Sequence, residues 1–127
     1  MKKRTILIVE DSPGFSELMK YVVEDEGYTG VIFPLEENFL HWVEKEKTVA
    51  IIMDLALNRM NGFDFIRELK NNAKFKRIPV IVITGKDLGV HDIAELKMYD
   101  IPYLRKGRVD MHEIHQAIKN AAGTSES

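Results

Sequence analysis

Several short stretches of the chain are apolar at every position, without the alternation of a half-exposed strand. Residues 6–9, 49–53 and 78–83 show this most clearly, and the last of them is rich in β-branched residues. Such runs are typical of strands that are covered on both faces, as in a parallel sheet. Two further β-prone stretches, 28–33 and 101–104, predict two more strands.

A helical pattern follows each of these stretches. After the first one, Ser12 is suited to an N-cap, Pro13 to the first helical position, and Gly27 to the end of a helix. Five apolar residues between them recur at the spacing of one buried helix face: Phe15, Leu18, Met19, Val22 and Val23. Comparable spacing predicts four more helices, over residues 35–46, 63–69, 93–98 and 109–122.

The strict alternation of strands and helices predicts a doubly wound α/β domain. Its sheet is expected to be parallel, with right-handed crossovers that place helices on both faces. We assign residues 1–122 to this one domain and residues 123–127 to a flexible C-terminal tail. Folds of this class bind ligands outside the carboxyl ends of their strands, so the residues that end each strand are the candidates for function.

Composition narrows the function classes. The chain has 127 residues, of which 45% are hydrophobic, which is enough for one well-packed domain. The net charge is −2, so no basic field favours direct contact with nucleic acid. There is no cysteine, which excludes disulfides, thiolate metal sites and thiol catalysis. The apolar run at 6–9 is too short for a signal peptide or a membrane span, so we expect a cytoplasmic protein without membrane contact.

The residues that end the predicted strands form an unusual set. Glu10 and Asp11 follow the first strand, Asp54 follows the third, Thr84 ends the fourth, and Lys106 lies near the end of the fifth. Converging carboxylates without cysteine form the hard oxygen site that Mg²⁺ prefers. An aspartate carboxylate can act as the nucleophile in phosphoryl transfer, where the protein mainly positions groups and neutralises charge.

Four short motifs carry a resemblance to a known family. They are Ile-Leu-Ile-Val-Glu-Asp at 6–11, Asp54 with Met-Asn-Gly at 60–62, Ile-Thr-Gly at 83–85, and Tyr-Leu-Arg-Lys at 103–106. In order and spacing they resemble the receiver domain of response regulators in two-component signalling, over essentially the whole chain. The resemblance implies a flavodoxin-like (CheY-like) sheet of five parallel strands in the order 2-1-3-4-5 with five helices.

The resemblance also implies roles for the acidic residues. Asp54 stands at the position of the phospho-acceptor, which receives a phosphoryl group from a histidine kinase or a histidine phosphotransfer protein. Glu10 and Asp11 stand at the acidic pair that holds Mg²⁺ together with Asp54. The backbone carbonyl of Ala56 stands at the position of a further metal ligand. The family is a signalling module, so we do not expect an enzyme that turns over external substrates.

Three other residues match the family's switch. Thr84 and Lys106 match the residues that contact the phosphoryl group, and Tyr103 matches an aromatic residue that turns inward on activation. The resemblance implies that phosphorylation draws Thr84 inward and remodels the face formed by the fourth helix, the fifth strand and the fifth helix. A downstream protein partner is expected to bind there.

The chain departs from the family pattern at three positions. Gly107 replaces a proline that forms a cis peptide after the lysine, and a non-proline cis peptide costs roughly 2.5 to 4 kcal/mol. We therefore expect a trans peptide and a less firmly aimed Lys106. Asn58 stands where proline is frequent, which predicts a looser loop after Asp54, and Ser12 replaces a residue that is more often acidic or Asn.

Other interpretations stay open. Glu10 and Asp11 could be an acidic pair favoured by a helix N-terminus. The domain could be a pseudo-receiver that binds proteins without being phosphorylated, as Gly107 would allow. A phosphatase with an aspartyl-phosphate intermediate would need a second carboxylate just after the nucleophile, whereas Asp54 is followed by Leu and Ala. His112 and His115 are interpreted as part of a solvated helix face, because no third metal ligand is evident.

Overall fold

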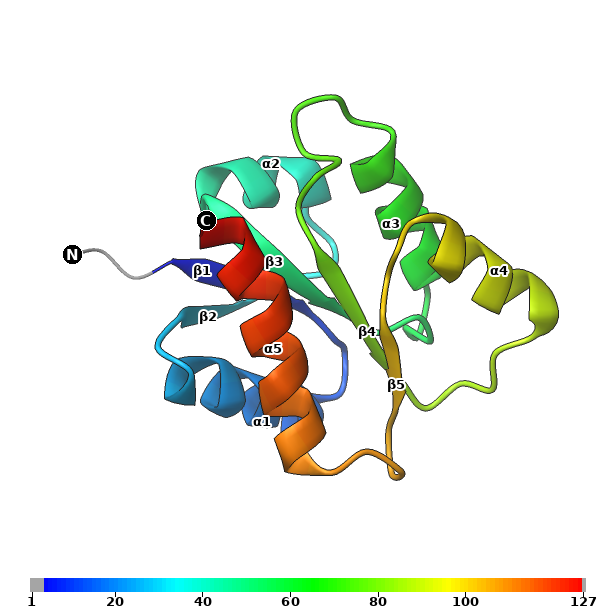
Figure 1. Ribbon diagram of the computed structural model, residues 1–127. Helices are drawn as coiled ribbons and strands as arrows, with labels where there is room; N and C mark the ends of the chain where they lie inside the picture. Colours follow the sequence, from blue (N-terminus) through cyan, green and yellow to red (C-terminus); the bar gives the residue numbers. More distant parts are fainter. Residues whose placement is uncertain (1–3, 127) are drawn as a thin grey trace.

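Five parallel strands form the central sheet of the computed structural model, which describes residues 4–126 (Figure 1). Their order is β2-β1-β3-β4-β5, so the predicted topology is confirmed. The strand bounds are Thr5–Val9 (β1), Thr29–Ile32 (β2), Thr48–Met53 (β3), Val80–Thr84 (β4) and Tyr103–Arg105 (β5). All of the pairings between them are parallel, so every carboxyl end lies at one edge of the sheet.

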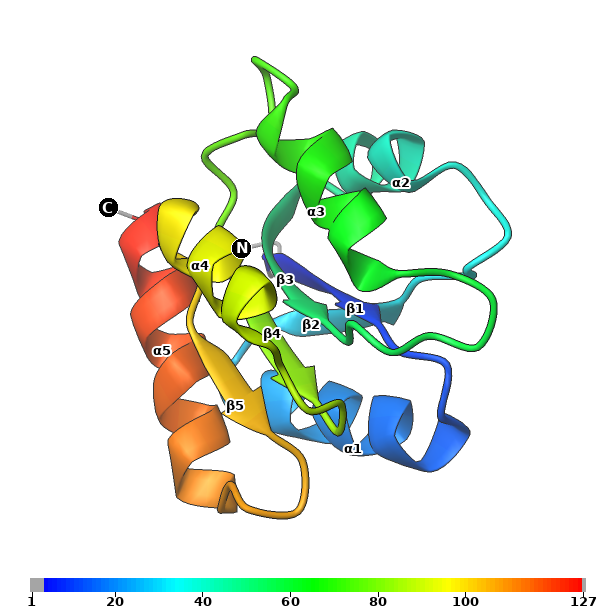
Figure 2. The ribbon, with the colours of Figure 1, turned by 90° about the vertical axis from the view of Figure 1, so that its right-hand side faces the viewer.

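Helices cover both faces of the sheet (Figure 2). Their bounds are Pro13–Asp25 (α1), Phe39–Lys45 (α2), Gly62–Lys70 (α3), Val90–Met98 (α4) and Met111–Glu126 (α5). The buried residues of α1 and α5 pack on one face, and those of α2, α3 and α4 pack on the other. The predicted doubly wound architecture is therefore confirmed.

The uninterrupted apolar run of β1 is explained by its position inside this sandwich. Ile6 and Ile8 point into the core beneath α1 and α5, whereas Leu7 and Val9 point into the core beneath α2 and α3. All four side chains are fully buried. A strand that is covered on both faces gains from apolar residues at every position, which is why the alternation is missing.

Several predicted boundaries were wrong in detail. The second helix begins at Phe39 rather than at residue 35, because the Asn38 side chain caps it by accepting a hydrogen bond from the His41 N–H at 2.9 Å. The fourth strand begins at Val80, after Pro79. Leu18 was predicted to face the core but is 39% exposed, and the small Ser16 is buried in α1 instead.

The last helix runs on past the boundary at residue 122 that the sequence suggested. It includes Gly123 and ends at Glu126, while Ser127 lies outside the described residues. The flexibility of this tail stays a prediction. None of the helices in residues 4–126 is long and apolar enough to cross a membrane. The cytoplasmic location also stays a prediction.

Candidate functional site

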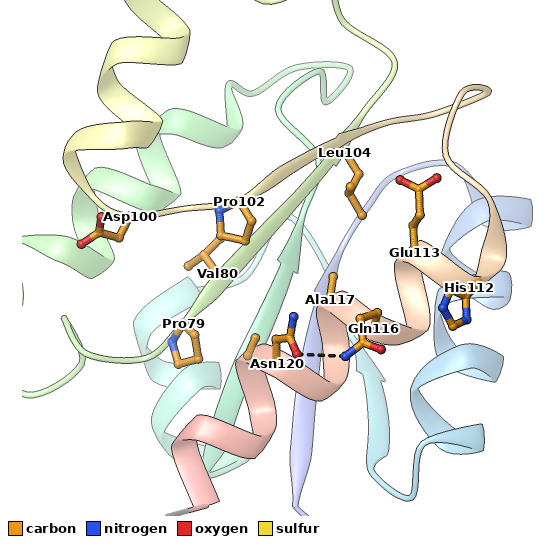
Figure 3. Close-up of a pocket in the computed structure, with 11 residues that line it drawn as sticks. Pro79, Val80, Asp100, Pro102, Leu104, His112, Glu113, Gln116, Ala117 and Asn120 are labelled. Carbon is orange, nitrogen blue, oxygen red and sulfur yellow. Dashed lines mark hydrogen bonds between the residues drawn. The ribbon is translucent and has the colours of Figure 1, made fainter.

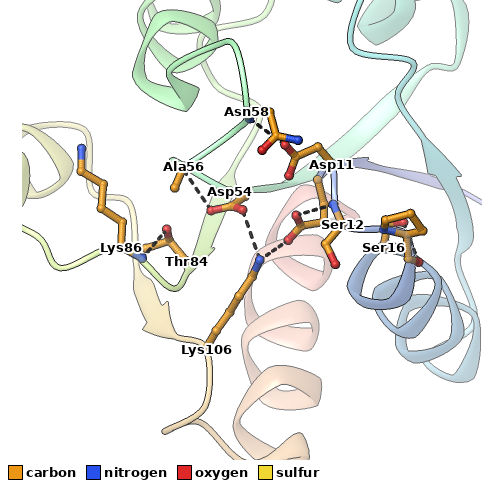
Figure 4. Close-up of polar contacts among 11 residues, drawn as sticks. Asp11, Ser12, Ser16, Asp54, Ala56, Asn58, Thr84, Lys86 and Lys106 are labelled. Carbon is orange, nitrogen blue, oxygen red and sulfur yellow. Dashed lines mark hydrogen bonds and ion pairs between the residues drawn. The ribbon is translucent and has the colours of Figure 1, made fainter.

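Three carboxylates meet at the carboxyl edge of the sheet (Figure 4). Glu10 and Asp11 directly follow β1, and Asp54 directly follows β3, the neighbouring strand. Asp54 is held there by its own backbone, since its N–H donates to the Val9 carbonyl at 2.9 Å and continues the ladder between the two strands. One carboxylate oxygen from each of the three residues lies within 4.8 Å of the others. The strand ends therefore bring the acidic residues together as the sequence predicted.

Backbone N–H groups orient each of these carboxylates. The Ser12 N–H donates to Glu10 Oε2 at 3.0 Å, and the Ala56 N–H donates to Asp54 Oδ1 at 3.1 Å. The third donor is Asn58, whose N–H lies 2.6 Å from Asp11 Oδ2. A proline at position 58 has no N–H and could not make this bond. The loop after Asp54 is thus tied to Asp11. The looser loop expected from Asn58 stays a prediction.

Lys106 reaches across from the end of β5 into the acidic cluster. Its Nζ lies 2.5 Å from Glu10 Oε1 and 3.1 Å from Asp54 Oδ2. Glu10 Oε1 is buried and has no well-aligned hydrogen bond within residues 4–126, so the Lys106 ion pair is its main compensation. The ammonium group therefore partly neutralises two of the three carboxylates.

The electrostatics of Glu10 and Lys106 are linked. Burial raises the pKa of the Glu10 carboxyl, and the nearby Asp54 adds to this, while Lys106 and the Ser12 N–H oppose it. Burial alone lowers the pKa of Lys106, but the contacts with Glu10 and Asp54 outweigh burial and raise it above its usual value. Lys106 is accordingly charged at neutral pH. The three carboxylates still carry more negative charge than this one ammonium group neutralises.

Gly62 packs against the backbone of Asp54, a contact that the motif at 60–62 did not reveal from sequence. A Cβ atom built at Gly62 would lie 2.3 Å from the Asp54 carbonyl oxygen and 2.8 Å from Leu55 Cα. The Gly62 N–H also donates to the Leu55 carbonyl at 3.1 Å. Only glycine lets the first turn of α3 approach the Asp54 backbone this closely.

Thr84 ends β4 and Tyr103 begins the neighbouring strand β5, and neither side chain bonds to the acidic cluster. Thr84 is buried, and its Oγ1 accepts a hydrogen bond from the Lys86 N–H at 3.2 Å. Tyr103 is 40% exposed. A hollow of about 190 Å³ lies beside both residues and is also lined by Leu88 and Ile93. The ring of Tyr103 therefore has a space next to Thr84.

The peptide that precedes Gly107 is trans, as the sequence predicted, because none of the peptide bonds in the described part of the chain is cis. Gly107 has φ of 81°, in the left-handed region that favours glycine. The Lys106 N–H donates to the Thr84 carbonyl at 2.9 Å and fixes the backbone just before this turn.

The residues at the edge of the sheet fit a magnesium ion. Glu10, Asp11 and Asp54 offer only oxygen atoms, and a small divalent cation with oxygen ligands is the group that such a set prefers. Lys106 is the ion-pair partner of both Glu10 and Asp54, so this one cation leaves the three carboxylates with an excess of negative charge that a divalent cation would balance.

A second group of possible metal ligands lies between α1 and α5. His115 Nδ1 lies 2.7 Å from Glu26 Oε2, and His115 Nε2 lies 3.9 Å from Asp25 Oδ2. The interpretation of this histidine as part of a solvated face was wrong, because α5 packs against the end of α1 and residues far apart in sequence meet there.

A further hollow, of about 520 Å³, lies between β5 and α5 (Figure 3). Leu104 of β5, Pro102 just before that strand, and Ala117 of α5 line it, and Gln116 Nε2 donates to Asn120 Oδ1 at 3.0 Å along its rim. None of the predicted site residues lines this hollow, so it is separate from the acidic cluster.

Comparison with known proteins identifies a family. The family model of the response regulator receiver domain matches residues 6–119. PilH of Pseudomonas aeruginosa is 32% identical over 82 residues, which cover 65% of this chain and 68% of PilH. An uncharacterised protein of Leptolyngbya boryana is 30% identical over 80 residues, which cover 63% of this chain and 61% of that protein. The match to the latter is thus shorter than two thirds of its length.

Solved structures agree with the fold. The signal receiver domain of a LuxO repressor protein from Vibrio parahaemolyticus superposes with a TM-score of 0.82 at 23% identity, covering 99% of this chain and 94% of that one. The receiver domain of a sensor histidine kinase from Pseudomonas aeruginosa gives a TM-score of 0.77 at 22% identity, covering 95% of this chain and 98% of that one. The latter structure holds a magnesium ion coordinated in its active site cleft.

Proposed function

Because this chain belongs to the response regulator receiver domain family, we propose that Asp54 accepts a phosphoryl group in a Mg²⁺-dependent reaction and that this modification changes the binding of a protein partner. The observation that carries the proposal is the position of Asp54. Its carboxylate is almost completely buried at the end of β3, beside two further carboxylates and the ammonium group of Lys106.

The proposed reaction needs a nucleophile and positive groups that neutralise the negative charge of the phosphoryl oxygens. An Asp54 carboxylate oxygen forms a bond to the phosphorus of the donor while the bond from phosphorus to the donor's leaving atom breaks, and the electron pair of that bond departs with the donor. The donor is a phosphohistidine of a sensor histidine kinase or of a phosphotransfer protein. The Ala56 N–H and Lys106 orient the two oxygens of the Asp54 carboxylate before the reaction.

The acidic residues would hold the metal. Glu10, Asp11 and Asp54 are the proposed side-chain ligands, Glu10 acting through water, and the backbone carbonyl of Ala56 is a proposed fourth contact. When bound, Mg²⁺ neutralises the oxygens of these residues and of the phosphoryl group. The magnesium ion in the Pseudomonas receiver structure supports the assignment of the ion by analogy.

Thr84 and Tyr103 are the proposed switch. The Thr84 hydroxyl accepts a hydrogen bond from Lys86, which leaves its proton available for a phosphoryl oxygen. A movement of Thr84 toward Asp54 would enlarge the hollow beside it, and the half-exposed ring of Tyr103 borders that hollow. The burial of Tyr103 would then alter the face formed by α4, β5 and α5, where we propose that the downstream protein binds.

Mass spectrometry of the intact protein tests the proposal. The wild type, Asp54→Asn and the surface variant Asp64→Asn are incubated with acetyl phosphate, with and without Mg²⁺. We expect one phosphoryl adduct on the wild type and on Asp64→Asn, only with Mg²⁺, and none on Asp54→Asn. A folded wild-type protein that gains no adduct, beside a receiver that does, would refute the proposal and favour the pseudo-receiver.

A further inference from the structure

Backbone hydrogen bonds hold Lys106 on both sides. Its N–H is bonded to the Thr84 carbonyl at 2.9 Å, and the Arg105 carbonyl accepts from the Arg108 and Val109 N–H groups, both at 3.1 Å, with Gly107 in a left-handed conformation between them. These bonds fix the main chain but not the end of the long lysine side chain. The direction of the ammonium group therefore depends on the groups that surround it.

Two of the three groups around the ammonium are carboxylates. Glu10 Oε1 and Asp54 Oδ2 lie 2.5 Å and 3.1 Å from Nζ. Both residues are also proposed metal ligands, and Asp54 is the proposed phosphoryl acceptor. Their oxygens therefore acquire other partners in the reaction, and neither carboxylate can be a constant support for Lys106.

The third group is the ring of Phe15, whose centroid lies 4.4 Å from Lys106 Nζ. A cation at this distance over an aromatic face is attracted by the ring's electron distribution. The ring takes no proton and binds no Mg²⁺, so it can hold the ammonium without withdrawing it from a phosphoryl oxygen. Of the three contacts, it is the one that the reaction leaves unchanged.

The position of the ring is itself fixed. Phe15 lies in the first turn of α1, where the Ser16 N–H donates to the Ser12 carbonyl at 2.9 Å and Ser16 Oγ donates to the Pro13 carbonyl at 3.1 Å. One part of the ring packs on the core beneath α1 and α5, a cluster that Leu104 of β5 also contacts. The ring therefore connects the start of α1 to the end of β5.

We propose that Phe15 is a positioning residue for Lys106, which holds the ammonium over its ring and directs it toward the phosphoryl group on Asp54. This proposal rests on the proposed function for its effect on the reaction. The aromatic face thereby supplies from α1 a constraint on the ammonium group that the backbone hydrogen bonds around Lys106 do not supply.

The test compares two substitutions of Phe15 that differ in whether the aromatic face is kept. Phe15→Leu keeps an apolar side chain and removes the aromatic face, whereas Phe15→Tyr keeps the face. We expect Phe15→Leu to slow Mg²⁺-dependent phosphorylation by acetyl phosphate roughly three- to tenfold, and Phe15→Tyr to stay within about twofold of the wild type. Thermal unfolding of each variant checks that the domain is folded.

A double-mutant cycle separates positioning from packing. In a Lys106→Met background, Phe15→Leu should cause no further slowing if the ring acts through the ammonium. The same slowing in both backgrounds, or a Phe15→Leu rate equal to that of the wild type, would overturn the proposal. A wild type that is not phosphorylated at all would instead contradict the proposed function.

A second readout does not depend on phosphorylation. In the wild type, the NMR signals of the Lys106 ε-methylene protons should be shifted upfield by the ring current of Phe15. In Phe15→Leu they should move to the position of a solvent-exposed lysine, and in Phe15→Tyr they should stay shifted. Unshifted signals in the wild type would refute the contact itself, whatever the protein's reactivity.

Discussion

Replacing Gly62 with alanine is expected to strain the backbone of the proposed acceptor. The added Cβ would lie 2.3 Å from the Asp54 carbonyl oxygen and 2.8 Å from Leu55 Cα. Both atoms belong to the main chain, so no side-chain rotation relieves the overlap. Overpacking of this kind costs typically about 1 to 3 kcal/mol, and we expect a value near the top of that range because α3 or the Asp54 segment must shift.

The cost can be converted into a melting temperature. Alanine gains roughly 0.5 to 1 kcal/mol over glycine within a helix, which leaves a net loss of about 2 kcal/mol. Unfolding entropies near 2.1 cal/mol/K per residue give about 0.27 kcal/mol per degree for a chain of this length, so Gly62→Ala should lower Tm by about 7 °C. The same shift should slow phosphorylation, since it moves the Asp54 carbonyl.

Gly14→Ala is the matched control. Gly14 also lies in the first turn of a helix, but no heavy atom lies within 4 Å of a Cβ built there. Its Tm should be equal to or slightly above that of the wild type. Thermal unfolding followed by circular dichroism measures both variants. A Gly62→Ala protein that melts within about 2 °C of the wild type would show that the close approach of α3 is not required.

Three further predictions concern polar contacts of titratable side chains. Burial raises the pKa of Glu10 above its usual value, so Glu10 takes up a proton at a higher pH than an ordinary carboxylate does. As the pH is lowered, the Mg²⁺ affinity measured by calorimetry should therefore begin to fall early. An affinity that stays equal down to pH 4.5 would contradict this. A double-mutant cycle on the bidentate pair of Arg67 with Glu95, which joins α3 to α4 at 2.7 and 2.8 Å, should give a coupling of about 0.5 to 1 kcal/mol in urea unfolding. Zero coupling would mean that solvent screens the pair. His115→Ala removes the contact with Glu26 and should cost about 1 kcal/mol, seen as a lower urea midpoint, and an unchanged midpoint would refute it.

The fold could be predicted from sequence because its signal is distributed along the chain. A strand that is apolar at every position indicates burial on both faces, and the helical spacing between the strands indicates the crossovers. Errors at single positions therefore do not change the predicted topology. The errors occurred where a side chain acts on its neighbours. The Asn38 cap sets the start of α2 at Phe39 instead of residue 35. In α1, the small Ser16 is buried and Leu18 is exposed.

The convergence of the acidic cluster was predictable for a different reason. Parallel strands deliver their carboxyl ends to one edge, so Glu10, Asp11 and Asp54 had to meet once the strands were assigned. The contacts made by Gly62, by Phe15 and by the Asn58 N–H were missed because each joins segments that the sequence does not relate. A hydrogen bond from a main-chain N–H in particular cannot be predicted from the residue type, because every residue except proline has this donor.

The charge of the site explains why Lys106 and a metal are both expected. Three carboxylates and one ammonium leave a net formal charge of about −2, and a phosphoryl donor that brings further negative oxygens would be repelled. In the proposed function, a bound divalent cation would cancel that charge. A phosphoryl group on Asp54 would need compensation too, and Lys106 Nζ already lies 3.1 Å from Asp54 Oδ2. The proposed metal would also neutralise Glu10, which would weaken the pairing of Glu10 with Lys106. The face of Phe15, which binds neither metal nor phosphoryl group, is therefore the support that we propose for the ammonium group.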